Sequence, residues 1–230
     1  LAQMGEVFGK YETGEYNKTG LVRDINTQVK RILKVATDYG FDDNLWHNYL
    51  TFFLMMSENP FSMTCEKVGA SDGSVNALVE NDFRIFKALF DYDFGPIEKD
   101  LGIHCFSQIS NYKAIHKKDL MYNKNVSEKV RSLSKKLEAA KDEKEFFDAV
   151  TGFYKDYGVG MFGLNKAFRI DDTPQGSFTF RAINNMDTVM LDDLVGYEIQ
   201  KKKLVDNTEA FVQGKKANNV LLFGDSGTGK

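Results

Sequence analysis

Apolar residues recur every three or four positions through the first two-thirds of the chain, the period of a helix with one buried face. The pattern predicts about six helices. They start near Leu21, after Asp42 or Asp43, at Ser74, at Pro96, at Ser127 and after Asp142. The third of them is expected to bury Leu78, Val79, Phe83, Phe86, Leu89 and Phe90. No fixed-period repeat accompanies the helices, so the pattern does not predict a solenoid.

Capping residues sharpen several of these boundaries. Gly40 and Gly158 stand where C-terminal caps are expected. Asp142 is followed three residues later by Glu145, which is typical of a capping box with Asp in place of Ser or Thr. Pro96 suits the first turn of a short helix, because a missing N–H costs nothing there.

The pattern changes after Gly158. Gly160 and Gly163 follow closely, and we expect the three glycines to break the helix. Two β-prone runs, 168–170 and 177–183, then flank a cluster of Pro, Gly and Asp residues. This arrangement predicts either a β-hairpin or a pair of linker strands.

A last helix is predicted from about Glu198 to Val212, and Gly214 ends it. The apolar run from Val220 to Phe223 is unbroken. Such a run is typical of a strand buried on both faces of a parallel sheet.

The chain ends in a glycine-rich loop directly after this predicted strand. Its residues fit the pattern G-x-x-x-x-G-K and are Gly224, Asp225, Ser226, Gly227, Thr228, Gly229 and Lys230. Glycines let phosphate oxygens approach the backbone, and successive N–H groups can form a nest for an anion. The lysine would reach the β- and γ-phosphates of a nucleoside triphosphate. A glycine-rich surface turn is the alternative.

A second segment supports the nucleotide hypothesis. Residues Leu191 to Gly196 lie upstream, with Gly196 28 positions before Gly224, and are similar to the segment that opens the AAA+ ATPase module. That resemblance implies that the backbone of Val195 and Gly196 lies against the adenine ring and hydrogen-bonds its edge. Taken alone, the segment would fit a helix cap followed by a turn glycine.

Longer stretches resemble one bacterial AAA+ group, domain of unknown function 815. They are Asp192–Glu198, Asn207–Gly214 and Asn218–Asp225, and the segment Gly158–Phe168 looks like the one that precedes the ATPase core in that group. The resemblance implies that the full-length parent binds and hydrolyses ATP with Mg²⁺. It names no substrate.

We therefore expect a mainly α fold in three parts. These are a helical N-terminal domain (1–163), a β-hairpin or linker (164–186), and the first strand and helix of a P-loop AAA+ α/β module (187–230). In AAA+ proteins the N-terminal domain commonly recruits a client or adaptor protein, and the ATPase works as an oligomeric ring. The same partners are expected here for the full-length parent.

No residue after Lys230 supplies the Ser or Thr that would bind Mg²⁺, the acidic Walker B strand, or the sensor and arginine-finger residues. We expect the 230-residue chain itself to bind ATP weakly or not at all, to carry no bound cofactor or metal, and to contain no catalytic residue. The neighbours of the strand at 220–223 would lie beyond Lys230. Residues from about Gly214 onward are therefore expected to be poorly supported, or to rest on the helical domain or a neighbouring copy.

Two other functions remain open at this stage. The chain could be a free-standing helical protein-interaction module without ATPase activity. Nucleic-acid binding ranks last: residues 113–144 carry ten Lys or Arg against five Asp or Glu, but the formal net charge of the chain is −3.

The remaining composition favours a soluble, cytoplasmic protein. Cys65 and Cys105 have no metal-ligand spacing and are expected to be reduced thiols. The longest apolar run, from Tyr49 to Met56, is too short to cross a bilayer. Structural or solvent-facing roles are expected for all three histidines, which are His47, His104 and His116.

Overall fold

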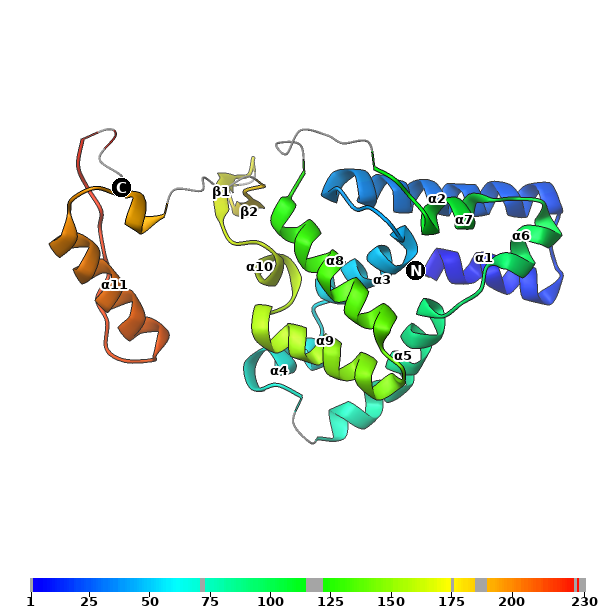
Figure 1. The fold of residues 1–230 in the computed structure, drawn as a ribbon, viewed down its shortest axis with the longest axis horizontal. Coiled ribbons are helices and arrows are strands. Elements are labelled where there is room, and N and C mark those ends of the chain that lie inside the picture. Colours follow the sequence, from blue (N-terminus) through cyan, green and yellow to red (C-terminus); the bar gives the residue numbers. More distant parts are fainter. Residues whose placement is uncertain are drawn as a thin grey trace. The chain divides into compact units, whose positions relative to one another are not determined.

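The computed structural model describes residues 2–70, 73–114, 122–174, 176–184, 190–225 and 227 (Figure 1). The chain divides into two compact units, Leu1–Asn185 and Met186–Lys230. The described residues are mainly helical, as predicted, with one two-stranded antiparallel sheet. No helix among them has both the length and the apolar character needed to cross a membrane.

The first unit contains ten helices and the sheet within its described residues. The elements are α1 (Ala2–Thr13), α2 (Lys18–Tyr39), α3 (Leu45–Met56), α4 (Pro60–Val68), α5 (Ser74–Phe90), α6 (Gly95–Leu101), α7 (Cys105–Ser110), α8 (Lys124–Ala139), α9 (Glu143–Tyr157), α10 (Gly160–Leu164), β1 (Phe168–Asp172) and β2 (Phe178–Ala182). The second unit contains a 3₁₀ turn, η1 (Leu191–Asp193), and α11 (Glu198–Val212).

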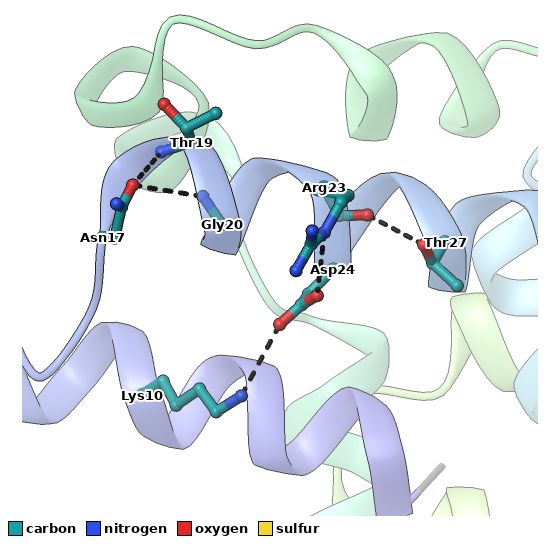
Figure 2. A network of polar contacts seen from close by, with 7 residues as sticks. All are labelled: Lys10, Asn17, Thr19, Gly20, Arg23, Asp24 and Thr27. Carbon is teal, nitrogen blue, oxygen red and sulfur yellow. Dashed lines mark hydrogen bonds and ion pairs between the residues drawn. The ribbon is translucent and has the colours of Figure 1, made fainter.

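Local sequence signals set both ends of α2. Asn17 has an extended backbone, and its side-chain oxygen accepts hydrogen bonds from the N–H groups of Thr19 and Gly20 at 2.9 and 3.3 Å (Figure 2). Gly40 ends the helix in the left-handed conformation at φ 68°, as predicted. Both ends are therefore fixed by residues next to the helix itself.

Helix α1 was not among the predicted helices, and it packs against α2. Its apolar face is narrow: Met4 and Val7 are its buried residues. Lys10 of α1 and Asp24 of α2 form an ion pair of 3.5 Å at the surface (Figure 2). Exposed pairs of this kind contribute about 1 kcal/mol or less, so burial of the apolar residues holds α1 in place.

Helix α3 begins one residue later than the predicted caps allow. Asn44 is its N-cap and accepts a hydrogen bond from the N–H of His47 at 3.0 Å, so the assignment of Asp42 or Asp43 as cap is wrong. Asp43 has φ 64° and pairs with Tyr112 in an isolated β-bridge. Its backbone is therefore committed to that bridge rather than to the helix.

Helix α8 begins a turn earlier than predicted. Asn123, not Ser127, caps it, and its side chain accepts a hydrogen bond from the N–H of Val126 at 3.2 Å. Ser127 is buried in the first turn and donates to the backbone oxygen of Gly40 at 3.1 Å. A serine at this place looks like a cap in the sequence because both roles require a small hydroxyl side chain.

Helices α4, α7 and α10 were also not predicted. Asn59 and Ser62 form a capping box around Pro60 at the start of α4. Gly158 ends α9 as predicted, whereas Gly160 and Gly163 lie within the short helix α10 that follows a tight turn. A Cβ on Gly163 would collide with the backbone of Gly158, so only glycine permits this close approach.

The core of the first unit is built largely on phenylalanine. Helix α3 packs against α2, α5, α7, α8 and α10. Phe83 packs edge-on against Phe147 at a centroid distance of 4.9 Å, and Phe90 packs in the same way against Phe146 at 5.1 Å, which joins α5 to α9. One residue of the predicted face of α5 is misplaced: Leu78 is 77% exposed.

The predicted hairpin is confirmed. Phe168 pairs with Ala182 and Asp172 with Phe178 in an antiparallel register. Phe162 of α10 lies against the rings of Phe168 and Phe180 at 4.9 and 5.3 Å. A two-stranded sheet is marginal alone, and these rings attach it to the helical unit.

Polar contacts fasten the base of the hairpin to α8. The side-chain amide of Asn123 donates to the side-chain oxygens of Asn165 at 2.5 Å and Asn184 at 3.4 Å. Lys129 donates to the backbone oxygen of Gly163 at 2.8 Å, near the end of α10. Since Asn165 precedes β1 and Asn184 follows β2, these bonds hold both ends of the hairpin.

In the second unit the predicted helix is confirmed as α11, and Gly214 follows it at φ 68°. The predicted strand at Val220–Phe223 is not formed, and no strand lies among the described residues of this unit. Leu221 is 81% and Phe223 87% exposed. A strand needs a neighbour for its backbone hydrogen bonds, and none is present among these residues.

Candidate functional site

A hollow of about 500 Å³ lies within the second unit, where two stretches predicted to act together meet. Its lining comes from residues 191–204 and from residues 221–225. The first stretch holds the segment similar to the AAA+ opening, and the second leads into the glycine-rich loop. The two are joined in space although Gly196 and Gly224 are far apart in the chain.

The first stretch begins with a series of turns that leads into α11. The N–H of Met190 donates to the carboxylate of Asp193 at 2.7 Å, which closes η1. Gly196 and Tyr197 then have φ values of 85° and 59°, and α11 begins directly afterwards. Two consecutive left-handed residues turn the chain sharply at this point. Val195, just before the turn, is 94% exposed.

Lys201 ties this turn to α11. Its ammonium group donates to the backbone oxygen of Leu194 at 2.9 Å and pairs with Glu198 at 2.9 Å. The lysine side chain is only 18% exposed and lines the hollow. Leu194 and Tyr197, on either side of Val195 and Gly196, line the hollow as well.

A reciprocal pair of hydrogen bonds holds the second stretch against the helix. The side-chain amide of Asn207 donates to the backbone oxygen of Asn218 at 2.8 Å, and its oxygen accepts from the N–H of Asn218 at 2.9 Å. Together these two bonds attach the backbone at Asn218, in the segment that leads to Val220, to α11. The hollow depends on this contact, because residues 221–225 form one of its walls.

The glycine-rich loop is described only in part. Gly224 and Asp225 line the hollow, and Gly227 has φ 81°, a conformation that favours glycine. Ser226, Thr228, Gly229 and Lys230 lie outside the described residues. Of the nine residues predicted to bind nucleotide, the structure thus brings Gly224 and Asp225 to the hollow and places Val195 and Gly196 between two of its lining residues.

Sequence reasoning missed Lys201, Asn207 and Asn218. All three act by holding backbone segments in place, and side chains of this kind have no motif of their own. The two asparagines do fall inside stretches that carry the family resemblance.

Outside the hollow, the cysteines and His47 have structural surroundings. No three or more His, Cys, Asp and Glu residues gather there in a way that could hold a metal ion. Burial raises the pKa of the Cys65 thiol, and likewise that of Cys105, which disfavours a reactive thiolate at either position. His47 stacks on Phe90 in the core, and His116 lies outside the described residues.

Comparison with known proteins adds one finding. Residues 164–230 match a family model, described as protein of unknown function DUF815. The match covers the hairpin and the whole second unit, including both stretches that line the hollow. No curated protein and no solved structure matches the chain. The C-terminal stretch is therefore similar to an uncharacterised family, as its sequence resemblance led us to expect, and the helices before it are not covered.

Proposed function

We propose that residues 187–230 begin a P-loop AAA+ module and that the full-length protein binds and hydrolyses ATP through it. The observation that carries this proposal is the hollow of the second unit. It joins the stretch around Val195 and Gly196 to the first residues of a loop with the pattern G-x-x-x-x-G-K. A chance glycine-rich turn would need no such partner.

The dimensions and chemistry of the hollow suit a nucleotide. Its volume of about 500 Å³ lies in the usual range for small-molecule sites. Leu194 and Leu204 supply apolar surface on one side for a base, and Gly224 opens the loop on the other. In this proposal, the backbone of Val195 and Gly196 hydrogen-bonds the edge of the adenine ring.

The loop would hold the phosphates. Its backbone N–H groups form the anion nest, glycine at 227 provides the left-handed turn, and the Lys230 ammonium group contacts the β- and γ-phosphates. Bound Mg²⁺ would bridge those phosphates and neutralise their charge.

The test uses the natural full-length protein. A fluorescent ATP analogue is titrated in the presence of Mg²⁺ into the wild type, into Lys230→Ala and into Lys216→Ala. Lys216 is an exposed lysine in the same unit and serves as the matched control. Lys230→Ala should weaken binding at least about tenfold, or about 1.4 kcal/mol, and Lys216→Ala should leave it unchanged. Equal affinity in all three proteins would refute the proposal.

We further propose that the helical unit recruits a protein client or adaptor, that the full-length protein assembles as a homo-oligomer, and that it works in the cytoplasm. What supports recruitment is a wide apolar groove on the first unit, lined by residues of α3, α4, α5 and α9.

The same groove supports a second candidate function, a protein-interaction module without ATPase activity. The two are separated by the titration above together with an ATPase assay. Partner binding without nucleotide binding would favour the module.

A further inference from the structure

The apolar groove of the first unit has a volume of about 480 Å³. Its walls are the end of α3, the start of α4, the middle of α5 and one residue of α9. Helices α4, α5 and α9 pack together in the lower part of the helical unit in Figure 1. The apolar side chains that matter most are Phe53, Leu78, Val79, Phe83 and Phe86.

Ring contacts and a hydrogen bond hold the floor of the groove together. Phe83 packs edge-on against Phe61 at 5.8 Å, and Phe53 stacks near Phe86 at 6.3 Å. The hydroxyl of Tyr154, which also lines the groove, donates to the backbone oxygen of Leu54 at 3.0 Å. A ligand would therefore meet a preformed surface and lose little free energy to ordering it.

One stripe of α5 runs along the groove. Leu78, Asp82 and Phe86 are spaced by four residues, so they lie one above another over about 12 Å of helix. Leu78 is 77% exposed and is not part of the core. An extended ridge of this kind fits a second helix, because helices pack by setting ridges into grooves.

Asp82 favours a positively charged side chain on any ligand of the groove. It is the one charged residue among the described residues that line the groove, and no cation pairs with it there. The polar groups next to it are already engaged: Ser57 donates to the backbone oxygen of Phe53 at 2.7 Å, and Asn59 caps α4. A partner that placed an anion here would face repulsion, and one with a cation would gain an ion pair.

We infer that this groove binds an amphipathic helix of a partner protein, with large apolar side chains along one face and a Lys or Arg that pairs with Asp82. The inference deepens the proposed recruitment role of the helical unit and does not depend on nucleotide binding. It belongs to the recognition mode in which the apolar face of a helix lies in a hydrophobic groove.

The probe is a synthetic helical peptide of about 18 residues with Leu and Phe at helical spacing and Lys beside the apolar face. A second peptide has Glu in place of each Lys. Both carry a fluorophore, and their binding to the full chain is measured by fluorescence anisotropy. The protein variants are Leu78→Gln and Asp82→Lys, with Val68→Gln as control, since Val68 is an exposed apolar residue at the far end of α4.

The Lys peptide should bind the wild type at least about tenfold more tightly than the Glu peptide. Leu78→Gln should weaken binding at least about tenfold, Asp82→Lys should reverse the preference between the peptides, and Val68→Gln should change neither. All three substitutions are at exposed positions, and circular dichroism checks that the helices are retained.

Three outcomes would overturn the inference. The first is no binding of the Lys peptide, and the second is binding that Leu78→Gln and Val68→Gln weaken equally. The third is dimerisation of the wild-type chain in sedimentation equilibrium that Leu78→Gln abolishes, because the occupant would then be a second copy. ATP titrations of the same variants should stay unchanged, so failure here is distinct from failure of the nucleotide proposal.

Discussion

Asn123 is the side chain on which the attachment of the hairpin depends most. It is 3% exposed, caps α8 through Val126, and donates to Asn165 and Asn184 at the two ends of the hairpin. Replacing it with alanine removes the cap and both side-chain bonds together. No other residue of this cluster has both roles.

The expected cost follows from these contacts. Loss of an N-cap typically costs about 1 kcal/mol, and loss of a buried hydrogen bond about another 1 kcal/mol. We expect Asn123→Ala to lower the free energy of unfolding of the first unit by about 2 kcal/mol. The melting temperature should fall by about 4–8 °C for a unit of this size.

The assay is urea unfolding followed by tryptophan fluorescence. Trp46 is the single tryptophan of the chain and is buried in the first unit, so it reports on that unit alone. Asn17→Ala is the matched control, because Asn17 caps α2 without holding another segment. It should cost about 1 kcal/mol.

The reasoning would be refuted if Asn123→Ala cost no more than Asn17→Ala. A double-mutant cycle with Asn165→Ala gives the sharper result, because Asn165→Ala removes the bond to Asn123 but leaves the cap of α8 intact. A coupling energy of at least about 0.5 kcal/mol is expected between Asn123 and Asn165, and a value near zero would show that the 2.5 Å bond between them contributes nothing.

Three further predictions concern other residues. Burial raises the pKa of the Tyr154 hydroxyl well above its usual range, so the folded state holds that proton more tightly than the unfolded state. The free energy of unfolding should therefore fall as the pH rises above about 10, and it should fall less steeply in Tyr154→Phe. At neutral pH, urea titrations of Tyr154→Phe should show a loss of about 1 kcal/mol, because the hydrogen bond to Leu54 is missing. The Cys65 thiol should react with a thiol reagent far more slowly in the native chain than in urea, since it is buried and its pKa is raised, and equal rates would contradict its placement. Asn207→Ala should release Asn218 and weaken binding of the ATP analogue several-fold in the full-length protein, whereas an unchanged affinity would mean that this contact does not shape the site.

Much of the fold follows from local signals that the sequence carries openly. Helices α2 and α9 combine a clear apolar period with a cap residue at each end, and both were predicted. Helix α11 buries no residue and has no side-chain cap at its start, but Gly214 follows its end; it and the hairpin were also predicted. Helix α1 escaped prediction because it buries little apolar surface, and α4 because its capping box uses Asn and Ser. A period of apolar residues predicts a face, but not how deeply each residue lies, which explains Leu78.

The candidate site also has one part that the sequence predicts and one that it does not. The loop from Gly224 is a contiguous motif and can be read directly, whereas the hollow arises only when Asn207 fixes residue 218 to α11. The strand predicted at Val220–Phe223 requires a neighbouring strand, which is a property of the sheet and not of the run itself. The groove on the helical unit is formed by three consecutive helices, α3, α4 and α5, together with Tyr154 of the distant helix α9, and no local pattern predicts it.

The most direct test of the nucleotide proposal is to locate the adenine ring. The full-length protein is photolabelled with azido-ATP in the presence of Mg²⁺, and the labelled peptides are identified by mass spectrometry. The proposal predicts that the label falls within residues 190–204, around Val195 and Gly196, and that unmodified ATP and Lys230→Ala both suppress it. Labelling confined to the helical unit, or labelling that Lys230→Ala leaves unchanged, would contradict it.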